Sequence, residues 1–482
     1  MSTKAVSQAN LNAQNSAELL SYVINQTPIL SENIDLPVQG ESIKPIGKII
    51  MGNVAYKNAF LNTLNLIGLT VITRNHWENP WKEFTDKGTL SYGQQIREII
   101  CDIANVYDYN EMLKNEDDFI KTEVPNVLSY LHEINYQKYY KTTTSDEQMA
   151  MAFETEDLFK LIDIIVNSLY EGYEYDIYQT NKYVLARRIL DGTVTPHQIV
   201  NFDTLTDRDI VVEMKGVSND MKFRSPNFNP AGLRKATAFD DQFAIVSTKF
   251  DAKFTTNVLA TSYFRDSAEM KAHMELCDGF GKFDTARLNH LFAKRDDRGE
   301  VIEGEYVAGY TPLTTDEMNK LNQIPAVIVG RDFFQDYRYG MDNSSENGAN
   351  LKKTEFFNPQ TLKRNHFLHI WGCISSSPFE NAVVFVKDTP AVTGVTVSPA
   401  QSTVSASIGN AQLTAKVATT GFANQAVVWS ITKGAEQGAK VDQNGLVTFP
   451  TTFTPAQNAI EVTATSVFDS TKKGTASITV VA

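Results

Sequence analysis

Residues 155–190 read TEDLFKLIDIIVNSLYEGYEYDIYQTNKYVLARRIL and predict one long amphipathic helix. Apolar residues recur there at the three-and-four spacing that places side chains on one face of a helix. They are Leu158, Leu161, Ile162, Ile165, Leu169 and Tyr173, with Ile164 and Val166 widening the stripe. At about 1.5 Å per residue, the helix is on the order of 50 Å long. A helix of this length needs a large partner surface and suits a flat, extended subunit.

Both ends of this helix carry residues that are typical of helix termini. Thr155 can cap the first turn, and two carboxylates follow it where the positive end of the helix dipole favours them. Arg187 and Arg188 lie in the last turn, and Gly192 follows as a stop signal. We therefore expect the helix to begin at residue 155 and to end at residue 190.

The stretch before the helix has the period of a strand. Between residues 128 and 140, apolar residues alternate with polar ones, as a half-buried strand requires. The apolar positions are Leu128, Tyr130, Ile134, Tyr136 and Tyr140. This pattern predicts a strand that leads into the helix.

The same segment carries a resemblance to a known family. Pro125-Asn126-Val127, Leu131-His132-Glu133 and Tyr139-Tyr140, followed by the long helix, resemble the major capsid proteins of short-tailed phages of the phi-twenty-nine type. The resemblance implies an α+β fold of the Hong Kong ninety-seven capsid type, with an N-terminal arm, an extended loop, a spine helix, and peripheral and axial lobes. In such a fold the segment closes the extended loop and enters the spine helix at residues 155–190.

Composition and charge narrow the classes of function. The chain has 482 residues, of which 42% are hydrophobic and 21% charged, so we expect two to four folded domains. Its three cysteines form neither a disulfide framework nor a paired zinc motif. The start of the chain lacks the pattern of a signal peptide, and no apolar run is long enough to span a bilayer, so we expect a soluble protein made in the cytoplasm, with no membrane partner.

The formal charge of −13 argues against a protein that reads nucleic-acid sequence. Residues 391–482 hold five lysines and four acidic residues, which leaves 39 basic and 53 acidic residues before them. The body thus carries a charge of −14. A container for DNA remains compatible with this charge.

The N-terminal part of the chain divides into an arm and an extended loop. Residues 1–50 are polar and interrupted by prolines, which predicts an N-terminal arm with one short helix near residues 16–24. The family resemblance implies that residues 51–390 form the capsid-fold domain. Residues 75–123 are expected to be the extended loop, with Trp77, Trp81 and Phe84 as candidate inter-subunit contacts. The alternative is that these aromatic residues fold back on their own subunit.

The remainder of the capsid-fold domain is expected to form two parts. Residues 200–325 make a second, axial lobe, with a capped helix at 206–217 and a strand at 242–250. Residues 326–390 are expected to return to the peripheral lobe, beginning with the buried strand 326–329.

The composition changes abruptly at residue 390. Residues 391–482 contain no Tyr, His, Arg, Met or Cys, and short strands recur between turn signals, which predicts a separate β-sandwich. The segments Thr396-Val397-Ser398-Pro399, Gln412-Leu413-Thr414-Ala415, Val428-Trp429-Ser430 and Thr463-Ala464-Thr465-Ser466 resemble the group-two bacterial immunoglobulin-like domain. The resemblance makes Trp429 the aromatic centre of the core between the sheets, with its N–H needing a partner.

No sequence motif supports a catalytic or cofactor-binding site. The segment Gly279-Phe280-Gly281-Lys282 lacks the spacing of a phosphate loop. His366, His369 and Cys373 are the best metal candidates, but on the expected strand the two histidines point to opposite faces. Acidic pairs at 240–241 and 296–297 are better explained as solvated loop charge. We therefore expect no enzyme, no cofactor and no metal site.

The sequence favours a structural protein that self-assembles into the icosahedral head of a tailed phage. The expected partners are further copies in hexamers and pentamers, a scaffolding protein, a portal or connector at one vertex, and double-stranded DNA held without sequence-specific contacts. The protein is then a virion component that is assembled in the host cytoplasm. A bacterial surface adhesin with an immunoglobulin-like module is the alternative, and an enzyme with such a module is a third reading.

Overall fold

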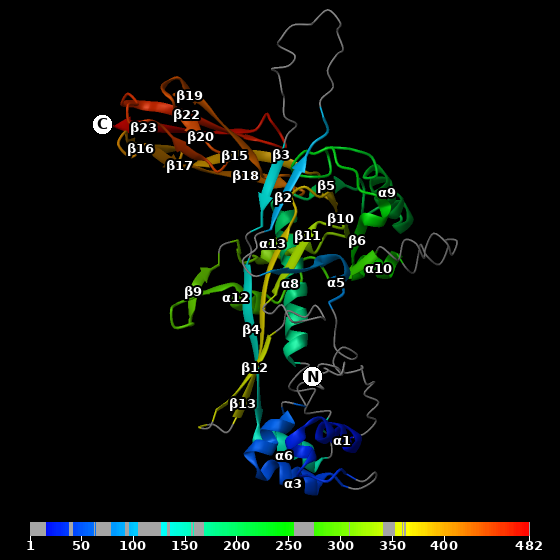
Figure 1. Ribbon diagram of the computed structural model, residues 1–482. Coiled ribbons are helices and arrows are strands. Elements are labelled where there is room, and N and C mark those ends of the chain that lie inside the picture. Colours follow the sequence, from blue (N-terminus) through cyan, green and yellow to red (C-terminus); the bar gives the residue numbers. More distant parts are fainter. Residues whose placement is uncertain are drawn as a thin grey trace, which may run out of the picture.

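The computed structural model is a mixed α+β protein (Figure 1). It describes residues 16–37, 42–61, 63, 79–91, 96–104, 127–132, 135–155, 158, 168–254, 274–307, 309–340, 352–358, 360 and 363–481. In the described part of the chain, no helix is long and apolar enough to cross a membrane.

A long sheet runs along one side of the molecule. Its central strand β13 (Lys363–Ser376) pairs antiparallel with β4 (Asn135–Ser145), β12 (Lys352–Asn358) and β11 (Phe334–Gly340). Strand β1 (Asp86–Ser91) joins parallel to β11, after the short helix α5 (Lys82–Thr85). Residues 86–91, expected in the extended loop, therefore belong to the sheet of the body.

The spine helix packs against this sheet. Helix α8 (Ser168–Leu190) has 23 residues, about 35 Å, and ends with Gly192 in the left-handed region, as predicted. Its predicted start is wrong: Thr155 ends the preceding helix α6 (Asp146–Glu154), which has a capping box made by Ser145 and Gln148. Most of the stretch between α6 and α8 lies outside the described residues.

The predicted strand 128–140 is in fact two strands. Strand β3 (Val127–Leu131) ends just before His132, and β4 begins at Asn135. Strand β3 pairs with β2 (Arg97–Cys101) and not with the long sheet. Because β3 and β4 are both half-buried, the apolar alternation continues across the break and conceals it.

The second lobe is built on a five-stranded sheet with a core on each face. The strand order is β5 (Thr195–Gln198), β14 (Ala382–Val386), β10 (Ala326–Gly330), β6 (Gln242–Ser247) and β7 (Met274–Cys277). Along β10, Val327 and Val329 enter one apolar core and Ala326 and Ile328 the other. This alternation explains why the whole segment 326–329 is apolar, as predicted for a buried strand.

This sheet corrects the expected division of the chain. Residues 326–390 were expected in the peripheral lobe, but β10 and β14 belong to the second lobe, and only β11, β12 and β13 lie in the long sheet. The predicted helix 206–217 is confirmed as α9 (Asp207–Asp220), with Thr206 as its cap. The expected strand 242–250 stops at Ser247, where α10 (Thr248–Phe254) begins. The other described elements between residues 200 and 325 are η3 (Phe239–Asp241), α12 (Thr285–Phe292), β8 (Ala293–Arg295), β9 (Val301–Tyr306) and α13 (Thr315–Leu321).

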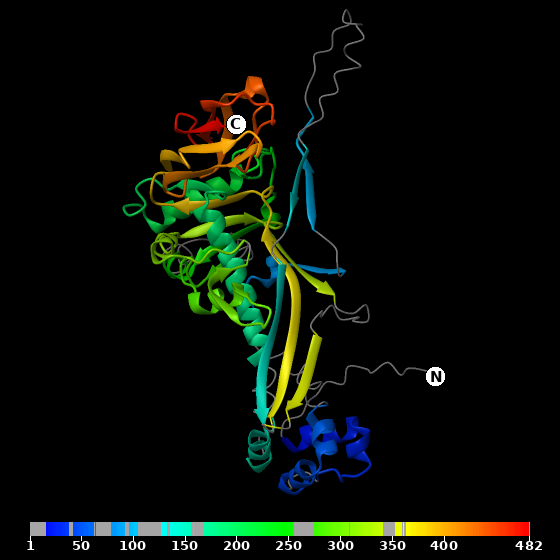
Figure 2. The same cartoon turned by 90° about the vertical axis from the view of Figure 1, so that its left-hand side faces the viewer.

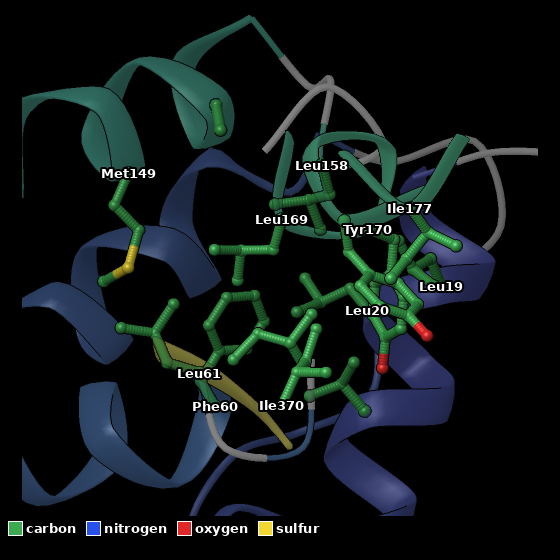
Figure 3. Close-up of a cluster of buried hydrophobic side chains, with 14 of the residues drawn as sticks. Leu19, Leu20, Phe60, Leu61, Met149, Leu158, Leu169, Tyr170, Ile177 and Ile370 are labelled. Atoms are coloured by element: carbon green, nitrogen blue, oxygen red, sulfur yellow. The ribbon is translucent and has the colours of Figure 1, made fainter. Parts of the chain in front are cut away.

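Residues 16–37 and 42–61 contribute to a helical cluster, which corrects the expectation of an arm there and confirms the short helix expected near residues 16–24. The cluster contains α1 (Ser16–Gln26), α2 (Pro28–Ser31), α3 (Lys44–Gly52), α6 and the helical residues 54–61. Leu19 and Leu20 of α1 are fully buried beside Phe60, Leu158 and Leu169 (Figure 3). Residues 1–15 lie outside the described part.

Residues 391–481 have a core of their own. Strands β16 (Gln401–Ser405), β23 (Lys473–Val481), β22 (Ala456–Ser466) and β19 (Val427–Lys433) form one sheet. Strands β15 (Ala391–Ser398) and β18 (Thr414–Thr420) pair separately, and so do β17 (Asn410–Gln412), β21 (Leu446–Thr448) and β20 (Lys440–Val441). A short helix, η5 (Ala435–Gln437), follows β19. Apolar side chains from all three sheets meet in one cluster. Short strands recur along this region, as predicted.

Candidate functional site

The two-stranded ribbon β2–β3 projects from the body and exposes apolar side chains (Figure 2). Figure 2 shows the ribbon leaving the body beyond the ends of the long sheet. Ile99 on β2 is 64% exposed and Ile103 42% exposed, and neither belongs to an apolar core of the described residues. An isolated two-stranded ribbon is marginally stable in water. The ribbon is therefore a candidate contact arm.

The base of the ribbon is fixed by a buried polar chain. Glu98 of β2 lies 3.1 Å from Nε2 of His132, and Nδ1 of the same ring is hydrogen-bonded to the hydroxyl of Ser375 on β13. Glu98 lies near the start of β2, His132 directly follows β3, and Ser375 belongs to the long sheet. The chain of contacts therefore joins the ribbon to the body. The His132 side chain is fully buried and Ser375 is 2% exposed. Although carboxylate, imidazole and hydroxyl follow in the order of a hydrolase triad, a serine without access to solvent cannot meet a substrate.

The end of the spine helix holds the same ribbon base. Arg188 donates from Nε to the hydroxyl of Ser376 at 2.7 Å and from Nη2 to the hydroxyl of Tyr130 at 3.1 Å. The guanidinium also lies over the Tyr130 ring, 6.0 Å from its centroid. Tyr130 packs edge-on against His132. One arginine thus connects the spine helix, the long sheet and the ribbon.

The second lobe makes a further contact with the ribbon. Arg234 Nη1 lies 3.4 Å from a carboxylate oxygen of Asp102, which follows β2. Because Arg234 is half-exposed, this pair is screened by solvent and contributes orientation more than stability. The direction in which the ribbon leaves the body is therefore set by three parts of the fold.

The sequence-based contact residues do not lie on the ribbon. Trp81 and Phe84 are buried in the core between the spine helix and the second lobe, with exposed fractions of 0% and 1%. The indole N–H of Trp81 donates to the carbonyl of Leu276, and the Phe84 ring stacks on Phe243. The prediction that Trp81 and Phe84 contact a neighbour is therefore wrong; they fold back on their own subunit. Trp77 lies outside the described residues.

Trp429 lies on the edge of the C-terminal core and is half-buried, not enclosed between the sheets. The backbone of Gly445 approaches the Trp429 ring so closely that a Cβ there would lie 2.9 Å from it. The ring therefore covers one side of the core. The prediction that Trp429 is the aromatic centre of this core is wrong.

The metal candidates are separated by the pleat of β13. His366 is buried on the side of β13 that carries Leu368 and Ile370, and it lies near Glu355. His369 lies on the opposite face, where its Nε2 is 2.8 Å from the hydroxyl of Thr354. The two histidines thus point oppositely, as predicted for a strand. Among the described residues, no group of three or more His, Cys, Asp or Glu side chains is arranged to hold a metal ion.

The acidic pairs engage the protein's own groups. Asp296 accepts hydrogen bonds from the backbone N–H groups of Arg298 and Glu300, which closes the turn between β8 and β9. Asp241 lies 3.8 Å from Arg331. These contacts give one member of each pair, Asp296 and Asp241, a structural role.

The middle of the spine helix is polar and nevertheless buried. Asp336 of β11 is 2% exposed and accepts a hydrogen bond from Asn181 of α8 at 3.3 Å. Next to it, Arg338 pairs with Asp86 at 2.8 Å. Burial raises the pKa of Asp336 to about 7, although the nearby Arg338 acts in the opposite direction. This polar seam fixes the register between spine helix, β11 and β1.

Comparison with known proteins identifies the family of this chain. A family model described as Phi29-like phage major capsid protein matches residues 31–386, which is more than half of the chain. The major capsid protein of Bacillus phage PZA is 27% identical over 415 residues, covering 84% of this chain and 81% of that protein. The major capsid protein of Bacillus phage GA-1 is 26% identical over 389 residues, covering 78% of this chain and 70% of that protein.

Chains in solved structures from phage particles are also similar to this chain. The capsid structure of Staphylococcus phage Andhra matches with a TM-score of 0.48 and 12% identity, over 65% of this chain and 86% of that chain. A chain from a structure of the native bacteriophage P68 matches with a TM-score of 0.48 and 14% identity, over 64% of this chain and 85% of that chain. On the extent of the family match, the chain belongs to the Phi29-like phage major capsid protein family.

Proposed function

We propose that this chain forms the closed icosahedral head of a tailed phage by placing its β2–β3 ribbon on a neighbouring copy. Its family assigns it a structural role in the phage head, as a virion component that associates with itself. The observation that carries the proposal is the projecting ribbon, whose exposed Ile99 and Ile103 have no core to enter among the described residues. Repeated in every copy, such a contact adds many modest areas into a strong shell.

The arrangement of elements supports a fold of the Hong Kong ninety-seven type. Helix α8 runs alongside the strands of the long sheet (Figure 1). Its residues enter both the core of the N-terminal helical cluster and a core of the second lobe. In this proposal the long sheet with α8 is the peripheral lobe, the five-stranded sheet is the axial lobe, and the ribbon is the extended loop. Hexamers and pentamers then form through the axial lobes.

The proposed partners follow from this role. A scaffolding protein supplies curvature during assembly in the host cytoplasm, and a portal or connector occupies one vertex. Double-stranded DNA fills the shell without sequence-specific contacts, because a body with a charge of −14 repels phosphate unless cations intervene.

For residues 391–481 we propose an immunoglobulin-like β-sandwich. Its support is a self-contained apolar core, antiparallel pairing of β19 with β22 and of β22 with β23, and the motif resemblance around Trp429. This core is mainly aliphatic, with Phe449 and Phe453 as its buried aromatic residues, which suits a small module appended to a larger fold.

Removing the ribbon tests the proposed head-forming role. A chain in which a short Gly-Ser linker replaces residues 99–129 should keep its thermal unfolding transition, since Glu98 and Tyr130 at the ribbon base stay in place and the cores of the body do not use Ile99 or Ile103. With scaffolding protein present it should form no closed shells by negative-stain electron microscopy, whereas the unaltered chain should form them. As a matched control, Val212→Ala changes an equally exposed residue on α9 and should leave shells intact. Normal shells from the ribbon-deleted chain would refute the proposal.

A further inference from the structure

We propose that the C-terminal domain has a second function inside the subunit: its segment 421–426, the docking loop, caps the end of the spine helix and thereby braces the base of the ribbon. The proposal rests on the proposed function only in treating the ribbon as the contact arm. Its basis is a set of contacts that join the docking loop, the last turn of α8 and the ribbon.

The docking loop supplies hydrogen-bond donors that the helix end lacks. The last carbonyls of a helix have no partner inside it. The turn at Gly192 satisfies two of them, because Gly192 N–H donates to Ile189 and Thr193 N–H donates to Arg188. The carbonyl of Leu190 instead accepts from the side-chain amide of Gln425 at 2.7 Å. The backbone N–H of Gln425 donates to the next carbonyl, that of Asp191, at 3.2 Å.

The two backbones fit closely at this junction. Gly192 has a φ of +68°, a conformation that side-chain-bearing residues seldom adopt. A Cβ at this position would lie 2.4 Å from the carbonyl oxygen of Ala423 and 2.5 Å from Cα of Asn424. Ala423 is fully buried. Glycine is therefore needed both for the turn and for the approach of the docking loop.

Phe422 anchors the docking loop in the body. Its φ is +59°, which is unusual for a bulky residue. Its ring packs against the core that contains Leu185, Ile189 and Val194. A flexible tether would relax to an ordinary conformation, so this residue is held where it is by packing against the spine helix.

The same helix turn holds the ribbon. Arg188 lies two residues before Leu190, and its guanidinium bonds to Tyr130 of β3 and Ser376 of β13. A cap that immobilises the last turn of α8 therefore limits the movement of Arg188 and, through it, of Tyr130. The path from docking loop to ribbon consists of contiguous contacts and needs no distant coupling.

Hydrogen exchange on the unassembled full-length chain tests this brace. The variant Gln425→Ala removes the side-chain cap, and Gly192→Ala disrupts the close approach. Gln443→Ala is the matched control, because Gln443 is an exposed glutamine of the same domain that lies outside the docking loop. In Gln425→Ala, amides in residues 186–194 and in residues 127–132 should exchange about tenfold faster, while the control exchanges like the unaltered chain.

The outcomes distinguish a docking loop that stabilises both the end of α8 and the ribbon base from one that stabilises only the end of α8. Faster exchange at both the helix end and the ribbon base supports the proposal, and Gly192→Ala should show the same pattern more strongly. Faster exchange at 186–194 alone, or no change at either place, overturns it. If Gly192→Ala does not fold, Gln425→Ala still decides the matter. Because no shell is formed in this experiment, its failure leaves the head-forming proposal standing, and failure of the ribbon deletion leaves the brace standing.

Discussion

Trp81 packs within its own subunit, although its sequence context predicts a contact between subunits. Its ring centroid lies 5.2 Å from that of Tyr178 and 5.9 Å from those of Phe84 and Phe334. An aromatic residue in a turn-rich, polar segment looks exposed in the sequence, because the sequence does not show which distant elements cover it. Here the cover comes from α8, β7 and β11.

The burial of Trp81 predicts a large loss of stability. Trp81→Ala should lower the free energy of unfolding by about 3–5 kcal/mol, since it leaves a cavity in the core. Phe223→Ala, at a phenylalanine that is 72% exposed, should change it by less than about 0.5 kcal/mol. Thermal and denaturant unfolding of the unassembled chain would measure both. Normal stability together with lost assembly in Trp81→Ala would restore the original inter-subunit role.

Asp336 predicts a pH dependence of stability. Folding raises its pKa from 3.8 to about 7, mainly through burial. Asp86 of β1 and Glu174 of α8 also raise this pKa, whereas Arg338 and the hydrogen bond from Asn181 of α8 lower it. Between these pH values the native state keeps a proton that the unfolded chain releases, so this group's contribution is fully present below about pH 4 and is lost as the pH rises through 7. The melting temperature of Asp336→Asn minus that of the unaltered chain should therefore be larger at pH 8 than at pH 5. An equal difference at both pH values would contradict the assignment.

At the scale of elements, the sequence predicts those whose signals are local. The apolar run 326–329 and the Thr206 cap each lie within a few residues, and both elements are present. The predicted start of the spine helix at Thr155 was wrong because a threonine can lie at either end of a helix. The structure places Thr155 at the C-terminal end of α6, whose N-terminus is capped by Ser145 and Gln148. The chain of Glu98, His132 and Ser375 joins residues 34 and 243 positions apart, so no local pattern could reveal it.

The sequence predicts the first N-terminal helix but not α2, α3 or their packing into a cluster, because these helices are short, contain prolines and depend on packing for their stability. Gly47 of α3 shows this packing: a Cβ there would lie 2.6 Å from the ring of Phe153 on α6. Gly47→Ala should therefore cost about 1–3 kcal/mol. Gly52→Ala, at the end of the same helix, meets nothing within 4 Å and should be neutral or slightly stabilising. Thermal unfolding compares the two; equal effects would show that α3 does not pack on α6 in solution.

At the scale of the whole molecule, the four apolar cores show which parts can exist separately. Three of them are built from residues before 391, apart from the half-buried Phe422, and the fourth lies entirely within residues 391–481. Phe422 and Gln425 nevertheless connect the last domain to the spine helix. The last domain thus has an apolar core of its own and is also attached to the spine helix.

We expect the C-terminal domain to lie on the outer surface of the particle. The fragment 391–482 should unfold cooperatively by itself, and Trp429→Ala should cost it about 1–3 kcal/mol, less than for an enclosed tryptophan. A chain truncated at residue 390 should still form particles with scaffolding protein, but fewer and less heat-resistant ones, because the cap of α8 is lost. Limited proteolysis of intact particles should cut after residue 391 and leave the body whole. Complete protection of this domain, together with no particles from the truncated chain, would make it an integral part of the shell wall.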